Sequence, residues 1–152
     1  MNANLEVDNS LIDIINQVLN NHDKPMLIAL AGQTAAGKTE IVSRLTEMLI
    51  KNGLSVTAVE MDHFLTDREE REIKGIDSLG REALHFDLFI KALEDLRFGK
   101  NVKTPQYDFI AATSSHSNDG ILKPGRAMNE IKAADIVFIE GNFPFLYKEV
   151  AS

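Results

Sequence analysis

The segment Gly32–Thr39 reads GQTAAGKT and fits the pattern G-x-x-x-x-G-K-[ST]. An unbroken apolar run, Met26–Ala31, precedes it and predicts a strand that is buried on both faces. Apolar residues at helical spacing follow it as far as Gly53, which can end a helix. A strand, a glycine-containing loop and a helix in this order form a phosphate-binding loop (P-loop), whose backbone N–H groups surround a polyphosphate. We therefore expect the chain to bind a nucleoside triphosphate.

The positions of the P-loop have expected roles in binding ATP and magnesium. Its two glycines allow the backbone to curl, and the helix that follows adds its positive N-terminal end. Lys38 neutralises phosphate charge, and the Thr39 hydroxyl can bind Mg²⁺. The residues expected to contact the nucleotide are Gly32, Gln33, Thr34, Ala35, Ala36, Gly37, Lys38 and Thr39.

The order of the elements predicts a single α/β domain over residues 1–152. After the P-loop helix, Ser55–Met61 predicts a second strand and Asp135–Gly141 a third. A strand, a helix and a strand in succession give parallel strands with a right-handed crossover. The fold class is therefore a three-layer P-loop NTPase fold with a parallel sheet. Further elements are expected at about residues 9–20 (amphipathic helix), 87–98 (amphipathic helix), 100–125 (short strand pair) and 131–134 (end of a short helix).

Acidic residues follow two of the predicted strands. Asp62 comes directly after the second strand, and Glu140 lies near the end of the third. Because open α/β sheets bind ligands at the carboxyl ends of their strands, both acids are expected beside the triphosphate. Asp62 could take a proton from an acceptor hydroxyl or hold the metal, and Glu140 occupies the place of a Mg²⁺-binding acid. With Lys38 and Thr39, these acids predict a site for Mg²⁺-assisted phosphoryl transfer.

Composition excludes several other classes of function. The 152 residues include no Cys, which excludes zinc–thiolate, iron–sulfur and cysteine-nucleophile sites. The 16 Lys and Arg against 23 Asp and Glu give a formal net charge of -7, which argues against binding to nucleic acid or to anionic membranes. No apolar run approaches the ~20 residues that span a bilayer, and no secretory signal is recognised at the N-terminus. We therefore expect a cytoplasmic protein whose partners are small molecules.

Other prominent residues have more ordinary expected roles. The charged stretch Thr66–Lys74 is expected to form a solvated helix face, with substrate binding by Arg68 or Arg71 as the alternative. His85 and His116 are expected at the surface rather than as ligands. The aromatic side chains expected in the helix core are Phe86, Phe89 and Phe98.

Five segments suggest a family. They are AGQTAAGKT (31–39), VEMDHF (59–64), HFDLF (85–89), TPQYDF (104–109) and IVFIEGNF (136–143). In this order they resemble the uridine kinase and phosphoribulokinase group of P-loop small-molecule kinases. The first segment is specific to P-loop NTPases in general, and the others point to this group only together.

The resemblance implies roles for several residues. Asp62 matches the acid that acts as base toward the acceptor hydroxyl and lies near the metal, and Glu140 matches the metal-side acid of the EG pair. Tyr107 matches an aromatic residue of the acceptor pocket, and Phe64 is implied as a further acceptor contact. Asp87 corresponds to an acceptor-binding acid if its segment aligns with the FD element of the group.

The chain also departs from the group. Nucleoside-specific members have Ser-Phe-Tyr after the aspartate, where residues 63–65 here are His-Phe-Leu. A His expected shortly after the YDF segment is absent from residues 110–112, which are Ile-Ala-Ala. The sequence EGNF slightly favours the pantothenate or sugar kinase-like branches of the group. Family members continue past the EG strand with further strands and an arginine-bearing lid, so these are expected to be missing from a chain that stops at Ser152.

Three functions remain open at this point. The leading hypothesis is a kinase that transfers the γ-phosphoryl group of ATP to a hydroxyl of a nucleoside or similar small metabolite. The alternatives are a catalytically poor nucleotide-binding module and a pantothenate or sugar kinase-like member of the same group. A GTPase is disfavoured because the chain has no N-K-x-D guanine motif. An open sheet without its last strands would expose an edge, which favours a homo-oligomer.

Overall fold

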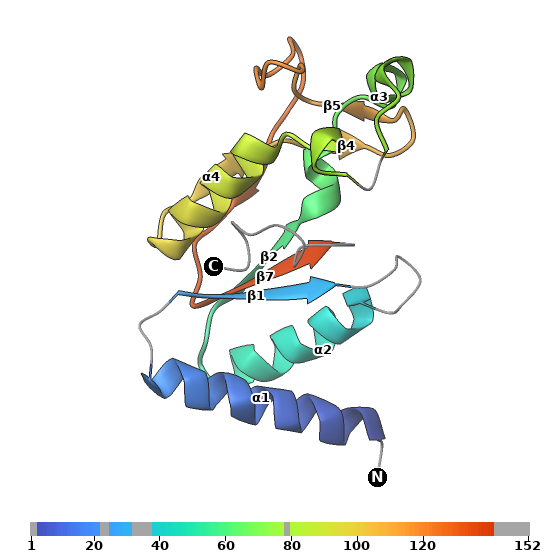
Figure 1. Ribbon diagram of the computed structural model, residues 1–152. Coiled ribbons are helices and arrows are strands. Elements are labelled where there is room, and N and C mark those ends of the chain that lie inside the picture. Colours follow the sequence, from blue (N-terminus) through green and yellow to red (C-terminus); the bar gives the residue numbers. More distant parts are fainter. Residues whose placement is uncertain (1–2, 22–24, 32–37, 78–79, 142–152) are drawn as a thin grey trace.

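The computed structural model describes residues 3–21, 25–31, 38–77 and 80–141 (Figure 1). Its α-helices are α1 (Ala3–Asn21), α2 (Lys38–Lys51), α3 (Arg68–Lys74) and α4 (Phe86–Arg97), and its short 3₁₀ helices are η1 (Met61–Phe64) and η2 (Arg81–Ala83). Its strands are β1 (Met26–Ala31), β2 (Val56–Glu60), β3 (Val102–Thr104), β4 (Tyr107–Asp108), β5 (Thr113–Ser114), β6 (Asn129–Ile131) and β7 (Ile136–Gly141).

A parallel sheet with the strand order β1–β7–β2 forms the centre of the described residues. Ile139 of β7 lies opposite Ala29 of β1 on one side and Val59 of β2 on the other. Residues 136–139 of β7 are at most 2% exposed, as expected for a strand covered on both faces. The predicted α/β fold with a parallel sheet is confirmed.

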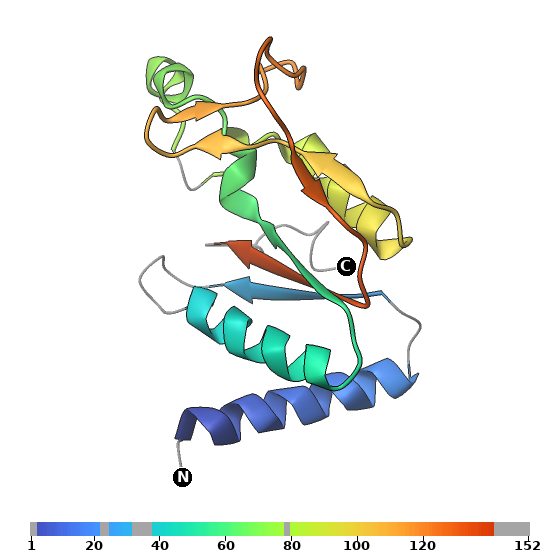
Figure 2. The ribbon, with the colours of Figure 1, turned by 180° about the vertical axis from the view of Figure 1, so that it is seen from behind.

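Helices cover both faces of this sheet, so the fold has three layers (Figures 1 and 2). On one face, Ile12 of α1 and Leu45 of α2 pack in a cluster with Phe138 of β7. On the other face, Phe89 of α4 packs in a second cluster with Val137 of β7. Successive residues of β7 enter opposite clusters because side chains alternate between the two faces of a strand.

Two small antiparallel pairs lie outside the central sheet. β4 pairs with β5, which places one short strand pair within residues 100–125 as predicted. β3 pairs with β6, and Val102 lies opposite Ile131. The expectation of a helix end at residues 131–134 is therefore wrong. Ile131 instead packs against the cluster that contains Val102, and this burial favours an extended segment.

The ends of two helices also differ from expectation. α1 begins at Ala3, earlier than the predicted start near residue 9. Phe98, expected in the helix core, is 78% exposed. It follows the last residue of α4 and lies at its C-cap, beyond the buried stripe of the helix.

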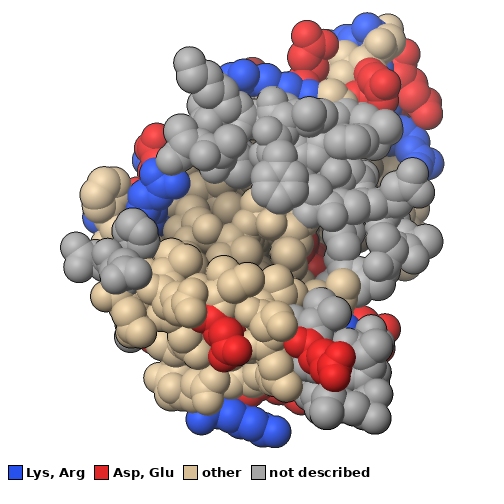
Figure 3. All heavy atoms as spheres, turned by 60° about the horizontal axis from the view of Figure 1, so that its bottom comes forward, with Lys and Arg blue, Asp and Glu red and all other residues tan. Residues whose placement is uncertain are grey.

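The face around α1 carries few charged side chains (Figure 3). Leu11, Ile14 and Val18 repeat at helical spacing along α1 and are 37%, 56% and 37% exposed. Homo-oligomer formation through exposed apolar surface stays a prediction. In the part of the chain that the structure describes, every helix is too short or too polar to cross a membrane.

Candidate active site

The carboxyl ends of β1, β7 and β2 lie at one edge of the sheet because the three strands are parallel. β1 ends at Ala31, immediately before the P-loop, and α2 begins at Lys38. The expected nucleotide contacts Gly32–Gly37 lie outside the described residues, as do the side chains of Lys38 and Thr39. The structure does describe the elements on either side of the loop, which are strand β1 before it and helix α2 after it.

The predicted base Asp62 and the predicted metal-side acid Glu140 both lie at this edge. Glu140 of β7 is half-buried and lies opposite Leu30 of β1 and Glu60 of β2. Asp62 is also half-buried and lies in η1, which begins directly after β2. The sheet therefore brings to one edge two acids that are far apart in the sequence.

A glycine permits η1 to pack closely against β7. A Cβ atom at Gly141 would lie 2.6 Å from Sδ and 2.8 Å from Cβ of Met61. These distances are well below the ~3.5–4.0 Å of an ordinary contact between non-bonded atoms. Only glycine fits at the end of β7 with Met61 in this place, and Met61 is the residue before Asp62. The contact therefore helps to fix the position of Asp62 relative to Glu140.

The donor atoms at this edge fit Mg²⁺. In phosphoryl-transfer sites Mg²⁺ is held by one or two carboxylates together with substrate phosphates, rather than by a cage of protein ligands. Asp62 and Glu140 supply carboxylates to this edge. Among the described residues, no three His, Cys, Asp or Glu side chains gather in a metal-binding cluster.

Phe64 and Tyr107, both expected to contact the acceptor, are buried. Phe64 is 1% exposed and packs edge-on against Phe89, with 5.1 Å between the ring centroids. The ring therefore packs in the core beside α4, and an acceptor contact of Phe64 stays a prediction. Tyr107 is 6% exposed, and Nη2 of Arg71 lies 3.5 Å from its hydroxyl oxygen.

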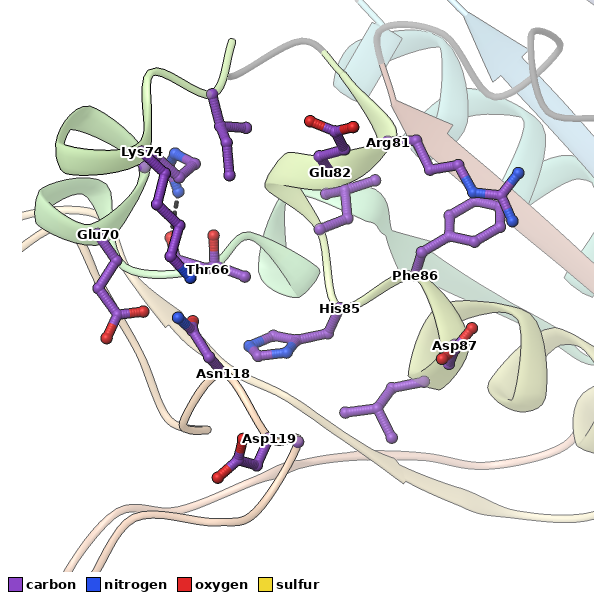
Figure 4. Close-up of a pocket in the computed structure, with 15 residues that line it drawn as sticks. Thr66, Glu70, Lys74, Arg81, Glu82, His85, Phe86, Asp87, Asn118 and Asp119 are labelled. Atoms are coloured by element: carbon purple, nitrogen blue, oxygen red, sulfur yellow. Dashed lines mark hydrogen bonds between the residues drawn. The ribbon is translucent and has the colours of Figure 1, made fainter.

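A cavity of about 630 Å³ lies between α3, η2, the start of α4 and the loop at residues 118–120 (Figure 4). The side chains of Glu70 and Lys74 reach into it from α3, and the ring of His85 points into it from the opposite wall. Asp87, the acid that the resemblance implies for acceptor binding, lines it from the first turn of α4. Asp62 does not line this cavity, although Thr66, a few residues further along the chain, does.

The cavity wall carries charges of both signs. Its cations come from Arg71, Lys74 and Arg81, and its acids are Glu70, Glu82, Asp87 and Asp119. Oε2 of Glu70 is buried, and no described residue forms a hydrogen bond with it. Such a wall can donate and accept hydrogen bonds, as binding of a small polar molecule requires.

Arg71 corrects the prediction of a fully solvated helix face. Its side chain is 6% exposed, and its Nη1 donates a hydrogen bond to the carbonyl oxygen of Thr66. The guanidinium also lies over the ring of Tyr107, with 5.9 Å between Cζ and the ring centroid. Arg68, the other arginine considered for substrate binding, is exposed. One arginine of α3 therefore points inward. The sequence did not predict this, because Arg71 lies within a dense run of charged residues.

Two histidines expected at the surface are buried behind the cavity. His85 and His116 are each 7% exposed, and their ring centroids are 6.1 Å apart. Nε2 of His85 lies 3.2 Å from the hydroxyl oxygen of Ser114, and Nδ1 of His116 lies 2.8 Å from that of Ser115. Burial lowers the pKa of His85, and the neighbouring His116 lowers it further. The contact of His85 with Ser114 joins the N-cap of α4 to β5, and no local pattern predicts such a contact between distant segments.

An ion pair anchors the same region. Nζ of Lys123 lies 2.8 Å from Oδ2 of Asp67, and Oδ1 of Asp67 accepts a hydrogen bond from the backbone N–H of Ser114. Burial alone would raise the pKa of Asp67, but the hydrogen bonds from Lys123 and Ser114 outweigh it and lower the pKa overall. The pair ties the start of α3 to β5 and to the loop that follows it.

The fold is that of the P-loop kinases. The chain shares its fold with a protein from Bacillus stearothermophilus described as a possible uridine kinase, at a TM-score of 0.67 and 20% identity over 91% of this chain and 72% of that one. The chain also shares this fold with D-glycerate 3-kinase from Cryptococcus neoformans, at a TM-score of 0.61 and 14% identity over 95% of this chain and 54% of that one.

The family follows from the sequence match. Residues 27–152 match the Phosphoribulokinase / Uridine kinase family, and the chain belongs to it. It is 29% identical over 146 residues to the chloroplastic phosphoribulokinase of Chlamydomonas reinhardtii, a match that covers 85% of this chain and 36% of that protein. It is 30% identical over 125 residues to the uridine kinase of Macrococcus caseolyticus, which covers 79% of this chain and 54% of that protein. The chain thus spans between a third and about half of the length of these relatives.

Proposed function

We propose that this domain transfers the γ-phosphoryl group of ATP to a hydroxyl group of a small polar metabolite. The observation that carries the proposal is the common edge at which β1 enters the P-loop segment, β7 presents Glu140 and η1 presents Asp62. Phosphoryl transfer needs a phosphate cradle, a metal-side acid and a base at one place, and little covalent work by the protein.

Each residue of this edge has a role in the proposed reaction. The backbone of Gly32–Gly37 surrounds the phosphates, and Lys38 neutralises their charge. Thr39 and Glu140 would hold Mg²⁺, which when bound would stabilise charge on the transferred phosphoryl group. Asp62 accepts the proton of the acceptor hydroxyl while the hydroxyl oxygen attacks the γ-phosphorus, and the bond to the β-phosphate oxygen breaks to release ADP.

The cavity between α3 and α4 supports the binding of a polar acceptor. Asp87 lines it and is proposed to accept hydrogen bonds from acceptor hydroxyls, and Tyr107 supports its wall through Arg71. The names of the relatives indicate different substrates, since one is a phosphoribulokinase and another is a uridine kinase. The proposed acceptor class is therefore a nucleoside or a similarly sized sugar or polyol, and pantothenate belongs in the same test.

The test is a titration of the purified chain with Mg·ATP by calorimetry, followed by measurement of ADP release with nucleosides, simple sugars and pantothenate. Asp62→Asn should keep ATP affinity within about tenfold and abolish transfer, because it removes the base but not the phosphate cradle. Asp13→Asn is the matched control, because Asp13 is an exposed aspartate of α1. Retained turnover in Asp62→Asn would show that Asp62 is not the base.

A second candidate function is a nucleotide-binding module with little catalysis. The chain spans 36% and 54% of the lengths of the two relatives, so the activity of these residues by themselves needs its own test. ATP binding without ADP release for any acceptor would support this module, and acceptor-dependent release by the 152 residues would exclude it.

A further inference from the structure

His63, the residue after Asp62, connects two segments that are distant in the sequence. Its Nδ1 accepts a hydrogen bond of 3.1 Å from the backbone N–H of Tyr107. Its Nε2 lies 3.1 Å from Oε2 of Glu60, at the end of β2. Its ring also lies edge-on to Phe109, with 5.3 Å between the centroids. The imidazole thus joins the end of β2 to the β4–β5 pair.

These two contacts indicate the tautomer of the ring. A nitrogen that accepts a hydrogen bond carries no proton, so in the neutral imidazole the proton lies on Nε2, which faces Oε2 of Glu60 at 3.1 Å. Glu60 therefore orients the ring, and the oriented ring fixes the backbone of Tyr107. Both nitrogens are occupied by protein groups, so His63 is not placed to exchange protons with a substrate.

Tyr107, whose backbone His63 holds, is in turn in contact with the wall of the cavity. Its ring lies edge-on to Phe109, with 5.1 Å between the centroids, and its hydroxyl lies within 3.5 Å of Arg71. Arg71 in turn is hydrogen-bonded to the carbonyl oxygen of Thr66, and both residues line the cavity. A continuous set of contacts therefore runs from Glu60, through His63 and Tyr107, to the proposed acceptor cavity.

We propose that His63 is a positioning residue that sets the acceptor cavity relative to Asp62. The inference rests on the proposed kinase function and adds a residue to it. Asp62 and His63 are adjacent in η1, so the ring that fixes Tyr107 belongs to the same short helix as the proposed base. A shift of about 1 Å between a base and its substrate can lower a rate about a hundredfold, so such a connection matters for transfer.

Three substitutions separate the two polar contacts of the ring. In His63→Asn the side-chain amide oxygen can take the place of Nδ1 and accept the N–H of Tyr107. In His63→Gln the amide group reaches toward the place of Nε2 and Glu60, and the acceptor for Tyr107 is lost. His63→Ala removes both bonds. The asparagine and glutamine variants are therefore matched controls for each other.

The kinetic test uses the full chain with the acceptor that releases ADP. His63→Ala and His63→Gln should raise the acceptor KM or lower kcat/KM by about tenfold or more, while the Kd for ATP changes by less than about twofold. His63→Asn should retain kcat/KM within about threefold of the parent. The proposal is wrong if His63→Asn is as impaired as His63→Ala, or if His63→Ala leaves kcat/KM within about twofold.

A second measurement tests the geometry without any activity. In the parent protein, the ¹⁵N shifts of His63 should report a proton on Nε2, and the amide of Tyr107 should exchange slowly with solvent. That slow exchange should persist in His63→Asn and be lost in His63→Gln, while the amide of Ser115, bonded to the carbonyl of Gln106, stays protected in both. A proton on Nδ1, or unchanged protection of Tyr107 in His63→Gln, would overturn the proposal. Absence of ADP release with every acceptor would instead count against the kinase function, and the exchange data would still decide the role of His63.

Discussion

The substitution Gly141→Ala tests the contact that holds η1 against the end of β7. The new methyl group would lie 2.6 Å from Sδ, 2.8 Å from Cβ and 3.3 Å from Cγ of Met61. Met61 is 6% exposed, so its side chain has no open space into which to turn. Rotation about χ1 also leaves Cβ in place, so the shortest carbon–carbon contact can be relieved only by a movement of the backbone.

The expected loss of stability follows from this geometry. Overpacking of a closely packed interior destabilises by about 1–3 kcal/mol. With a urea m-value of about 2 kcal/mol/M, the unfolding midpoint should fall by about 0.5–1.5 M. The cost should be smaller in a Met61→Ala background, because the contacts with Sδ and Cγ are then absent and only the one with Cβ remains.

The assay is urea unfolding followed by circular dichroism, with Gly80→Ala as the matched control. Gly80 has φ of -87°, and among the described residues the only atom within 4 Å of a Cβ there is the carbonyl oxygen of Asp77 at 3.5 Å. The control should therefore change the free energy of unfolding by less than about 0.5 kcal/mol. A midpoint for Gly141→Ala that equals that of the parent would refute the close packing of η1 on β7, and with it the argument that this contact fixes Asp62.

Other predictions concern the charged groups of the site. The pKa of His85 is lowered chiefly by burial, so below its ordinary value of 6.5 the unfolded chain binds more protons than the folded one. The urea midpoint should therefore fall between pH 7.5 and 5.5, less so in His85→Gln, and a midpoint that rises on acidification would contradict this. Lys123→Met should destabilise by about 1–2 kcal/mol, because Asp67 loses its charged partner, whereas Lys132→Met, at an exposed lysine, should be nearly neutral in the same urea titration. Because the lowered pKa of Asp67 stabilises the fold above its ordinary value of 3.8 and this contribution is lost in stronger acid, Lys123→Met should also reduce the acid sensitivity of the midpoint. Lys38→Ala should weaken Mg·ATP binding at least about tenfold in calorimetry, and an unchanged Kd would refute its role in the phosphate cradle.

The central sheet and the frame of the P-loop were predictable from local patterns. The apolar runs before Gly32 and before Glu140 extend over strands β1 and β7, because a strand buried on both faces leaves little room for polar residues. The glycine-containing motif between a strand and a helix indicated a nucleotide site, and the order of strands and helices implied that their carboxyl ends meet. Local patterns were therefore sufficient to place Asp62 and Glu140 at one edge of the sheet.

The segments between the sheet strands were less predictable. Residues 131–134 looked helical, but Ile131 is the last residue of β6, whose partner β3 lies far earlier in the chain. Short strands owe their state to such partners, and a helical or extended preference over a few residues is weak. Phe98 does not continue the buried stripe of α4, which includes Phe89 and Leu96, and it follows the last residue of the helix, so its ring is exposed.

By itself, the sequence determined the strand–loop–helix frame, the family and the acids at the sheet edge, since each depends on residues that are neighbours in the chain. Only the tertiary structure decided that Phe64 lies in the core, that Arg71 and His85 turn inward, and that His63 bonds to Tyr107. The physical reason is that burial and hydrogen bonding of a side chain depend on what packs over it. For these residues the packing partners come from β4, β5 and α4. These elements are distant in the sequence, so the local spacing of residues does not predict the contacts.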